Sequence, residues 1–248
     1  MIHVICSRWG DKYGIEYVNK LYSMTKRHLP AEFKFYCQTD DTNGMDPVIE
    51  QLPFLEDLPE SSPQAMLESS DWMNDLPRLW DRPKLNYFKP DGWGITGTRI
   101  ALDLDIIIHN DLTPILDLYD KPLTGRSWWH DMAKEKKPFW RRNYGARNNG
   151  SFYMWDGDDF APIWEDLQKN WKKIYFIFHG GSDNFITTRH LDCFDFVPPE
   201  YYYSMNRSGT RIHDDKIICT FNTDAREFSR FEIHEWVQLD PKVAELWQ

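Results

Sequence analysis

The chain has 248 residues, with 29 Lys and Arg against 39 Asp and Glu, a formal net charge of −10 and 41% hydrophobic residues. This hydrophobic share suffices for a sizeable core and excludes general disorder. The acidic balance argues against a sequence-independent nucleic-acid binder, because such proteins need clustered Lys and Arg. The imbalance is local: residues 39–77 contain ten acidic residues and no Lys or Arg, which leaves 29 of each sign elsewhere.

The opening of the chain predicts strands alternating with a helix, as in an α/β protein. An apolar run at 2–7 predicts the first strand, and apolar residues at helical spacing from 15 onward predict a helix that Pro30 closes. Residues 33–39 and 48–52 predict two further strands. Together these elements are typical of the start of a Rossmann-like sheet.

The stretch 53–82 is acidic, contains four prolines and has few periodic apolar residues, so it predicts a long excursion beside the sheet. Regular structure is expected after it as a short helix at 83–88, strands at 98–103, 106–109, 123–128 and 150–155, helices at 158–171 and 182–190, and strands at 201–204 and 216–221. Because no repeat or clear linker interrupts this order, we expect a single domain over 1–248 with a mixed central sheet.

The cysteines and the apolar runs indicate in which cellular compartment the protein is expected. Four cysteines lie in or beside apolar runs without forming a CxxC pair: Cys6, Cys37, Cys193 and Cys219. This pattern predicts buried reduced thiols instead of a zinc site or a disulfide framework. The apolar start is too short for a signal peptide, and no run approaches the roughly 18 apolar residues of a membrane span. We therefore expect a soluble cytoplasmic protein without a transmembrane segment.

Two aspartates, Asp103 and Asp105, interrupt an otherwise apolar run at 99–109. Residues two apart in a strand point to the same face, so we expect both carboxylates to emerge together. Like charges side by side in a buried strand are costly unless a cation joins them. Carboxylate oxygens suit Mg²⁺ or Mn²⁺, with phosphate oxygens completing the coordination. The alternative is that one aspartate caps a turn while the other is solvated.

Three classes of protein are compatible with this pair and its surroundings. In a haloacid-dehalogenase-like phosphatase, Asp103 would be the nucleophile and 181–184 would supply a later acidic motif. A non-catalytic carbohydrate-binding protein would instead use the aromatic residues, which include 12 Trp, to stack on sugars. A third class depends on the order of further motifs along the chain.

These motifs lie at 6–8, Tyr13 with 17–22, 39–41, 83–85, 102–106, 148–151, 181–184 and 216–221. In their type and order the chain resembles the GT-A glycosyltransferases, especially small bacterial and phage enzymes akin to glycosyltransferase family 8. The resemblance implies a GT-A-like fold. It also implies transfer of a hexosyl group from a nucleotide-sugar, with a UDP-sugar as the first expectation, to a hydroxyl of a glycan, lipid or other acceptor.

The resemblance also implies a metal site. Asp103 would face the donor ribose and the metal, and Asp105 would bind the metal, Mn²⁺ or Mg²⁺, directly. The ion would neutralise charge that grows on the nucleoside-diphosphate leaving group. Family members often supply a third ligand from a His in an F-H-G motif. This chain has Phe-Asn-Thr at 221–223, so Asn222 is the expected ligand, with His213 as a nearby substitute.

The expected donor site lies at the carboxyl ends of the first strands. Ser7 ends the first strand, Tyr13 would stack on the base, and Asp40 would accept a hydrogen bond from it. Lys84 would hold phosphate or the sugar. In the simpler interpretations, Tyr13 is only an aromatic residue at the start of a helix and Lys84 is a surface lysine.

The expected sugar pocket involves three residues later in the chain. Asn149 and Gly150 would line it, because glycine lets the backbone approach a ligand. Asp183 would bind sugar hydroxyls or assist the acceptor as a base. Its rival role is to cap the helix that begins there.

Two charged segments have less specific interpretations. The segment 134–147 holds six basic residues, one acidic residue and three aromatic residues. It is either an acceptor or diphosphate contact or a solvated loop. We interpret the acidic excursion at 53–82 as a flap beside the donor site.

Overall fold

A computed structural model describes the chain except for residue 11 and residues 56–81, 128–145, 179–180, 206–210 and 222–239. Within the described residues, seven strands form a central sheet and three form a second sheet. In the central sheet the strand order is β3 (Glu50–Leu52), β2 (Phe33–Gln38), β1 (Ile2–Ser7), β4 (Arg99–Leu102), β7 (Asn148–Trp155), β6 (Leu123–Arg126) and β8 (Asp195–Phe196). In the second sheet it is β5 (Ile106–Ile108), β10 (Ile218–Thr220) and β9 (Tyr202–Ser204).

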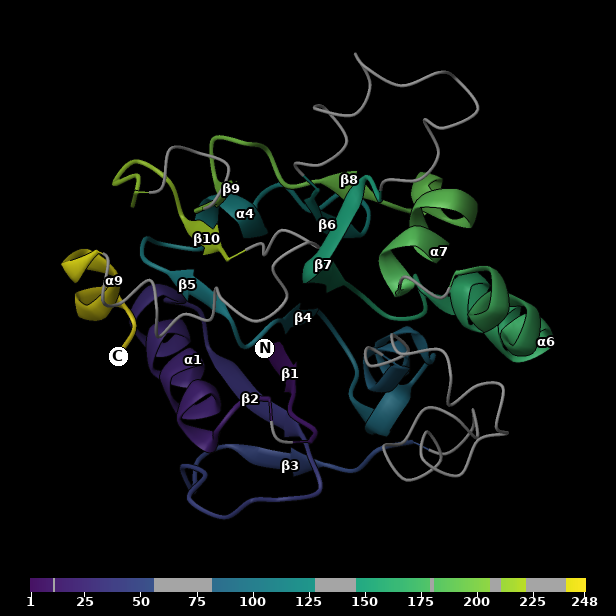
Figure 1. Cartoon of the computed structure of the whole chain (residues 1–248), viewed down its shortest axis with the longest axis horizontal. Helices are drawn as coiled ribbons and strands as arrows, with labels where there is room; N and C mark the ends of the chain where they lie inside the picture. Colours follow the sequence, from purple (N-terminus) through teal and green to yellow (C-terminus); the bar gives the residue numbers. More distant parts are fainter. Residues whose placement is uncertain (11, 56–81, 128–145, 179–180, 206–210, 222–239) are drawn as a thin grey trace.

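The helices cover different parts of these sheets. In Figure 1, α1 and α9 lie next to each other at one end of the molecule, and α6 and α7 lie at the other. The α-helices are α1 (Ile15–His28), α4 (Thr113–Leu116), α6 (Ala161–Ile177), α7 (Ser182–Arg189) and α9 (Pro241–Leu246). The 3₁₀ helices are η1 (Arg82–Phe88), η2 (Gly92–Gly94) and η4 (Leu191–Cys193).

The N-terminal half of the central sheet is Rossmann-like, as expected. Strands β3, β2, β1 and β4 are all parallel, in the order 3-2-1-4 that this fold uses. The other half is mixed, because β7 runs antiparallel to β4 and to β6 while β8 runs parallel to β6. The prediction of an α/β fold with a mixed central sheet is therefore confirmed.

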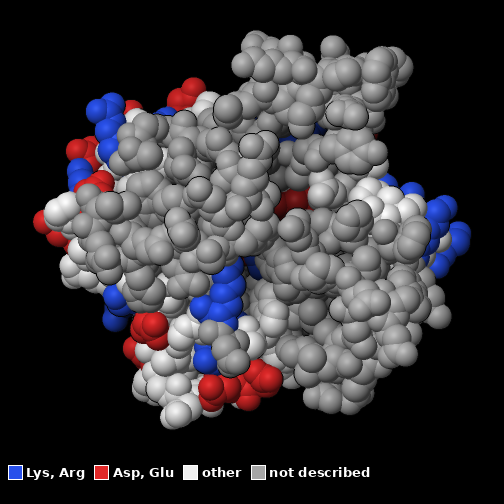
Figure 2. Space-filling view, in the orientation of Figure 1, with Lys and Arg blue, Asp and Glu red and all other residues white. Residues whose placement is uncertain are grey.

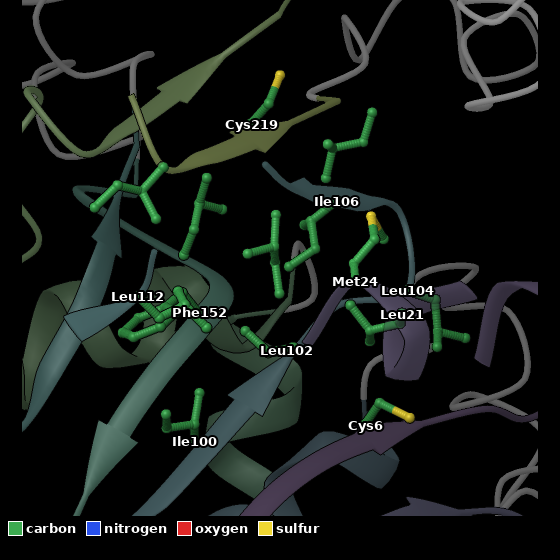
Figure 3. Close-up of a cluster of buried hydrophobic side chains, with 14 of the residues drawn as sticks. Cys6, Leu21, Met24, Ile100, Leu102, Leu104, Ile106, Leu112, Phe152 and Cys219 are labelled. Carbon is green, nitrogen blue, oxygen red and sulfur yellow. The ribbon is translucent and has the colours of Figure 1, made fainter. Parts of the chain in front are cut away.

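Buried side chains alternate between the two faces of the central sheet, as the period of two in a strand requires. On the face covered by α1 and the second sheet lie Val4, Cys6, Ile100, Leu102, Phe152 and Met154. On the face covered by η1, α6 and α7 lie Ile5, Ala101, Tyr153 and Trp155. Figure 3 shows the first cluster, where Leu21 and Met24 of α1 meet Leu102 and Leu104. The sheet is thus buried on both faces, which leaves its edges and strand ends for polar groups.

The two aspartates do not lie within a strand, so the expected strand geometry at this point is wrong. Strand β4 ends at Leu102 and β5 begins at Ile106, and the chain crosses between these ends from the central sheet to the second sheet. All residues of β4 and β5 are buried. Since neither strand has a solvent-facing side, the carboxylates occupy the bend that joins them.

The later elements also differ from the predictions in position. The strands expected at 201–204 and 216–221 form as β9 and β10, but they pair in the second sheet. Helix α6 begins at Ala161, because Asp159 Oδ2 accepts a hydrogen bond from Asp156 N (2.9 Å) and holds a turn before the helix. Helix α9 was not predicted, although Asp240 caps it and proline follows at its first position.

The predictions about thiols and membrane spans have mixed outcomes. All four cysteines are free and three of them are buried, but Cys193, in the short helix η4, is only partly buried. In the described part of the chain, no helix has the length and apolar character to span a membrane. The single-domain assignment remains a prediction. Most of the acidic excursion and of the basic segment lies outside the described residues.

Candidate functional site

Three strands bring their polar ends to one edge of the central sheet. Because β1 and β4 are parallel, Ser7 and the bend after Leu102 lie at the same edge. Because β7 is antiparallel to β4, its first residues lie there too, and Asp103 N donates a hydrogen bond to Ser151 O (3.0 Å). Figure 2 shows acidic atoms recessed in a hollow near the middle of this view of the molecule.

Asp103 is paired with a lysine. Lys84, from η1, forms an ion pair with Asp103 Oδ1, and both side chains are largely shielded from solvent. Burial raises the pKa of Asp103, Lys84 opposes that shift, and the nearby Asp105 adds to it. The ionised carboxylate is thus costly here, and a second cation beside it would be favoured. The structure thus places Lys84 next to the aspartate pair, while its role in holding phosphate or the sugar stays a prediction.

Tyr13 lies near the second aspartate. Burial raises the pKa of Tyr13, and the charges of Asp105 and Asp103, together with an interaction between its hydroxyl and the Asp105 carboxylate, raise it further. Its backbone is held by Arg8, whose Nε donates to Tyr13 O (3.0 Å). The same guanidinium reaches Asp41 Oδ2 (3.4 Å). Tyr13 therefore lies beside the carboxylate pair with a neutral phenol.

Ser7 and Asp40 are both at strand ends, but their environments differ. Ser7 is buried, and its Oγ is hydrogen bonded to Gln38 Oε1 (2.6 Å) and to the hydroxyl of Tyr87 (2.6 Å). This network fastens η1, which carries Lys84, to the ends of β1 and β2. Asp40 follows β2 and is exposed.

A second carboxylate, Asp183, reaches the same edge from α7. Gly150 N and Asn148 Nδ2 both donate to Asp183 Oδ1, at 2.9 Å and 3.0 Å. The pairing of β6 with β7 shifts between Thr124 and Gly125, which places 150–152 in a bulge. A Cβ on Gly150 would lie 2.9 Å from Asp183 Oδ1, so only glycine leaves room for this contact. The carboxylate thus ties the start of α7 to the start of β7.

The neighbours of Asp183 complete this part of the edge. Asn149 Oδ1 accepts a hydrogen bond from Ser151 N (2.8 Å), so its side chain shapes the turn. Burial raises the pKa of Tyr202, and the charges of Asp103 and Asp183 both add to the increase. The phenol of Tyr202 thus lies within electrostatic reach of both carboxylates.

The donor atoms of Asp103 and Asp105 suit a divalent cation, because hard oxygen ligands bind Mn²⁺ and Mg²⁺. Among the described residues, no group of three or more His, Cys, Asp or Glu is placed to hold a metal ion. Asn222, the expected third ligand, lies outside the described residues. His213 packs its ring edge-on against Tyr203, with ring centroids 5.0 Å apart, and is not grouped with the two aspartates.

Sequence reasoning did not identify several residues that shape the site: Gln38, Tyr87, Asn148 and Tyr202. For Tyr87 a signal existed, because residues three apart in a 3₁₀ helix share a side and Tyr87 follows Lys84 by three. Asn148 stands next to the predicted Asn149. Tyr202 belongs to the second sheet, so its proximity to the edge depends on tertiary structure alone.

Comparison with known proteins supports the fold. No protein-family model matches the sequence, and no curated protein sequence matches it significantly. Solved structures do match. One is the galactosyltransferase LgtC in complex with donor and acceptor sugar analogs, with a TM-score of 0.59 and 14% identity, over 100% of this chain and 95% of that chain.

Two other glycosyltransferase structures have the same architecture. GlyE from Streptococcus pneumoniae TIGR4 has a TM-score of 0.57 at 12% identity, over 100% of this chain and 63% of that chain. Mouse xyloside xylosyltransferase 1, in its apo form, has a TM-score of 0.53 at 11% identity, over 89% of this chain and 97% of that chain. These similarities show that the chain has a GT-A-like glycosyltransferase fold.

Proposed function

We propose that this chain is a metal-dependent glycosyltransferase that moves a hexosyl group from a nucleotide-sugar, with a UDP-sugar as the first candidate, to a hydroxyl of a glycan, lipid or other acceptor. The observation that carries the proposal is the shared edge of the sheet. There, the bend with Asp103 and Asp105 is hydrogen bonded to β7, and β7 is hydrogen bonded to Asp183. One side offers carboxylates to a cation and the other offers a fixed carboxylate to a sugar.

In this proposal the side with Asp103 and Asp105 binds the metal and the nucleotide part of the donor. Asp103 and Asp105 hold Mn²⁺ or Mg²⁺ together with Asn222, and Lys84 contacts the donor phosphates. The ion, when bound, neutralises charge on the nucleoside-diphosphate leaving group. Tyr13 and Asp40 contact the base. Ser7 supports this site by fastening η1 through its hydrogen bond to Tyr87.

The sugar and the acceptor belong to the Asp183 side. Gly150 and Asn149 line the pocket, and Asp183 either orients sugar hydroxyls or assists the acceptor hydroxyl as a base. A cytoplasmic location is part of the proposal, because Cys6 and Cys37 lie directly opposite each other on β1 and β2 and are free thiols. Free thiols favour a reducing compartment.

The direct test is hydrolysis of UDP-sugars with Mn²⁺, comparing the wild-type protein with Asp105→Asn. We expect the variant to lose at least about 100-fold in rate, because removing one group that stabilises the transition-state charge typically has that effect. Asp120→Asn is the matched control, since Asp120 is an exposed aspartate after α4. Equal rates in the wild-type protein and Asp105→Asn would contradict the metal assignment.

A thermal-shift screen tests the donor class. Nucleotide-sugars are expected to raise the Tm with Mn²⁺ present and to lose most of that effect with EDTA, because a ligand of the native state stabilises it by mass action. A phosphoryl analogue trapped on Asp103 without nucleotide affinity would favour a phosphatase. Glycan binding that ignores EDTA, without donor binding, would favour a carbohydrate-binding protein.

A further inference from the structure

The last residue of α9, Leu246, and the two residues after it contact α1. Trp247 is 3% exposed. Arg27 of α1 donates to the carbonyls of Leu246 (2.9 Å) and Gln248 (2.8 Å), and Lys20 Nζ lies 3.6 Å from the centroid of the Trp247 ring. Carbonyls at a helix end accept cationic donors readily, and an indole is the best ring for a cation. The contact is therefore built from several independent interactions, and Figure 1 shows α9 beside α1.

A line of aromatic rings leads from this contact to the aspartate pair. The Trp247 ring meets Tyr17 edge-on at a centroid distance of 5.0 Å, and Tyr17 meets Tyr13 at 4.9 Å. Both distances are in the range of favourable aromatic pairs. Tyr17 is fully buried, and Tyr13 ends the line next to Asp105, whose carboxylate interacts with its hydroxyl. Three rings thus connect the C-terminal end of α9 with the bend after β4.

The contacts of Tyr13 indicate what this line controls. Arg8 holds the backbone carbonyl of Tyr13, and Lys12 Nζ lies 4.6 Å from the centroid of its ring. The inner side of the ring packs on Tyr17, which packs in turn on Trp247. The Tyr13 ring is thus in contact with a buried ring that is itself in contact with Trp247.

We propose that Trp247 is a positioning residue for the donor and metal site, acting through Tyr17 and Tyr13 on Asp105. The link to donor binding rests on the proposed function, whereas the placement of Tyr13 does not. Without Trp247 the Tyr17 ring gains space, the Tyr13 ring loses its fixed orientation, and Asp105 loses its interaction with the Tyr13 hydroxyl. Trp247 touches neither the donor nor the ion in this proposal.

The test compares Trp247→Ala, Trp247→Phe and Val243→Ala. Val243 is a buried residue of α9 one turn before Trp247, so Val243→Ala weakens the docking of α9 without removing a member of the line of rings. Binding of UDP with Mn²⁺ is measured by calorimetry at a temperature where all variants are folded. Trp247→Ala should weaken it roughly three- to tenfold, the range for losing one aromatic pair, with kcat for hydrolysis less affected than KM. Trp247→Phe should restore most of the affinity.

A second readout needs no donor. Nitration of Tyr13 by tetranitromethane, followed by peptide mass spectrometry, should be faster in Trp247→Ala than in the wild-type protein and unchanged in Val243→Ala. Equal nitration in Trp247→Ala and wild type, or equal changes in Trp247→Ala and Val243→Ala, would overturn the positioning role. If nitration changes as expected but the wild-type protein binds no UDP with Mn²⁺, the positioning of Tyr13 stands and the proposed function fails.

Discussion

The two carboxylates that meet at the edge of the sheet, Asp103 and Asp183, are held in opposite ways. Asp103 faces the cation of Lys84, and burial raises its pKa. Asp183 faces two neutral donors, the backbone of Gly150 and the amide of Asn148. We call η1 and the bend after β4 the cation side, and the starts of β7 and α7 the fixed side.

The difference indicates what each side can do. A lysine on a flexible stem can be exchanged for, or joined by, another cation, whereas a carboxylate anchored on backbone N–H keeps its direction. A similar difference is found among titratable groups further from the edge. On the cation side, His109 follows β5, the strand after the bend, and is buried in its neutral form. Behind the fixed side, Asp166 of α6 accepts hydrogen bonds from Arg189 and His190 at the end of α7.

Removing the cation should give the largest change in stability of the variants proposed here. Lys84→Met leaves Asp103 shielded from water without its counter-charge, so the free energy of unfolding should fall by about 3 kcal/mol at pH 7. The double variant Lys84→Met with Asp103→Asn should recover most of the loss, because a neutral amide needs no counter-charge. Urea denaturation of the four proteins of this cycle measures the coupling.

An exposed ion pair supplies the control for this experiment. Lys34 and Glu50 pair at 3.0 Å, and about half of each side chain is exposed. Lys34→Met should leave stability unchanged within the error of the measurement. A loss in Lys84→Met no larger than that in Lys34→Met would remove the distinction between the cation side and an ordinary surface pair.

As the pH falls, the stabilising contribution of His109, on the cation side, should be lost before that of Asp166, on the fixed side. Burial, with His28 and Lys242 nearby, lowers the pKa of His109 to about 4. Its neutral form stabilises the folded state above about pH 6.5, and this contribution of about 3 kcal/mol is lost as the pH falls from 6.5 towards 4. Burial raises the pKa of Asp166, but hydrogen bonds from Arg189, Asn170 and His190 outweigh it and hold that pKa at about 2. Its contribution, about 2 kcal/mol, is lost only between about pH 3.8 and 2.

Urea denaturation at a series of pH values separates the two groups. His109→Gln should flatten the pH dependence between 6.5 and 4, and Asp166→Asn should flatten it only below 4. The histidines His3 and His28 also have lowered pKa values, so the informative quantity is the difference between each variant and the wild-type protein. If the free energy of unfolding depends on pH equally in His109→Gln and in the wild-type protein between pH 6.5 and 4, then His109 does not cause the loss of stability in that range.

Local patterns determined much of the fold. The apolar run of β1 predicts its bounds correctly, and the spacing in α1 predicts the helix to within two residues of its end. Both signals depend only on residues close in sequence. The start of α6 could not be placed in this way, because Asp159 is used by a turn and by Tyr119 from a distant part of the chain. Hydrogen bonds between remote segments leave no periodic trace in the sequence.

The site shows the same limit. The Asp-Leu-Asp motif, Lys84 and Asp183 could be selected by residue type and by resemblance, and the structure brings Asp103 to Lys84 and Asp183 to Gly150. What joins them is the antiparallel pairing of β4 with β7. The connection of Trp247 to Tyr13 could not be predicted either, since α9 and α1 lie at opposite ends of the sequence.

The smallest change to stability should come from a single methyl group on the fixed side. In Gly150→Ala the new Cβ would lie 2.9 Å from Asp183 Oδ1 and 3.2 Å from the hydroxyl of Tyr153, so the carboxylate must turn away and lose its backbone donor. The expected cost is about 1 kcal/mol of stability, because one hydrogen bond is lost. Hydrolysis of UDP-sugar should fall about tenfold or more, since displacing a positioned group strongly lowers catalytic rates.

Gly92→Ala is the matched control for this prediction, because a Cβ there makes only ordinary contacts, the nearest at 3.5 Å. It should leave hydrolysis unchanged. If Gly150→Ala lowers stability while hydrolysis stays at the wild-type rate, Asp183 serves only to join α7 to β7, and the chemistry belongs to the cation side alone. If hydrolysis falls while Mn²⁺ with UDP binds as tightly as before, the two sides act separately, because the fixed side can then be damaged without loss of donor binding.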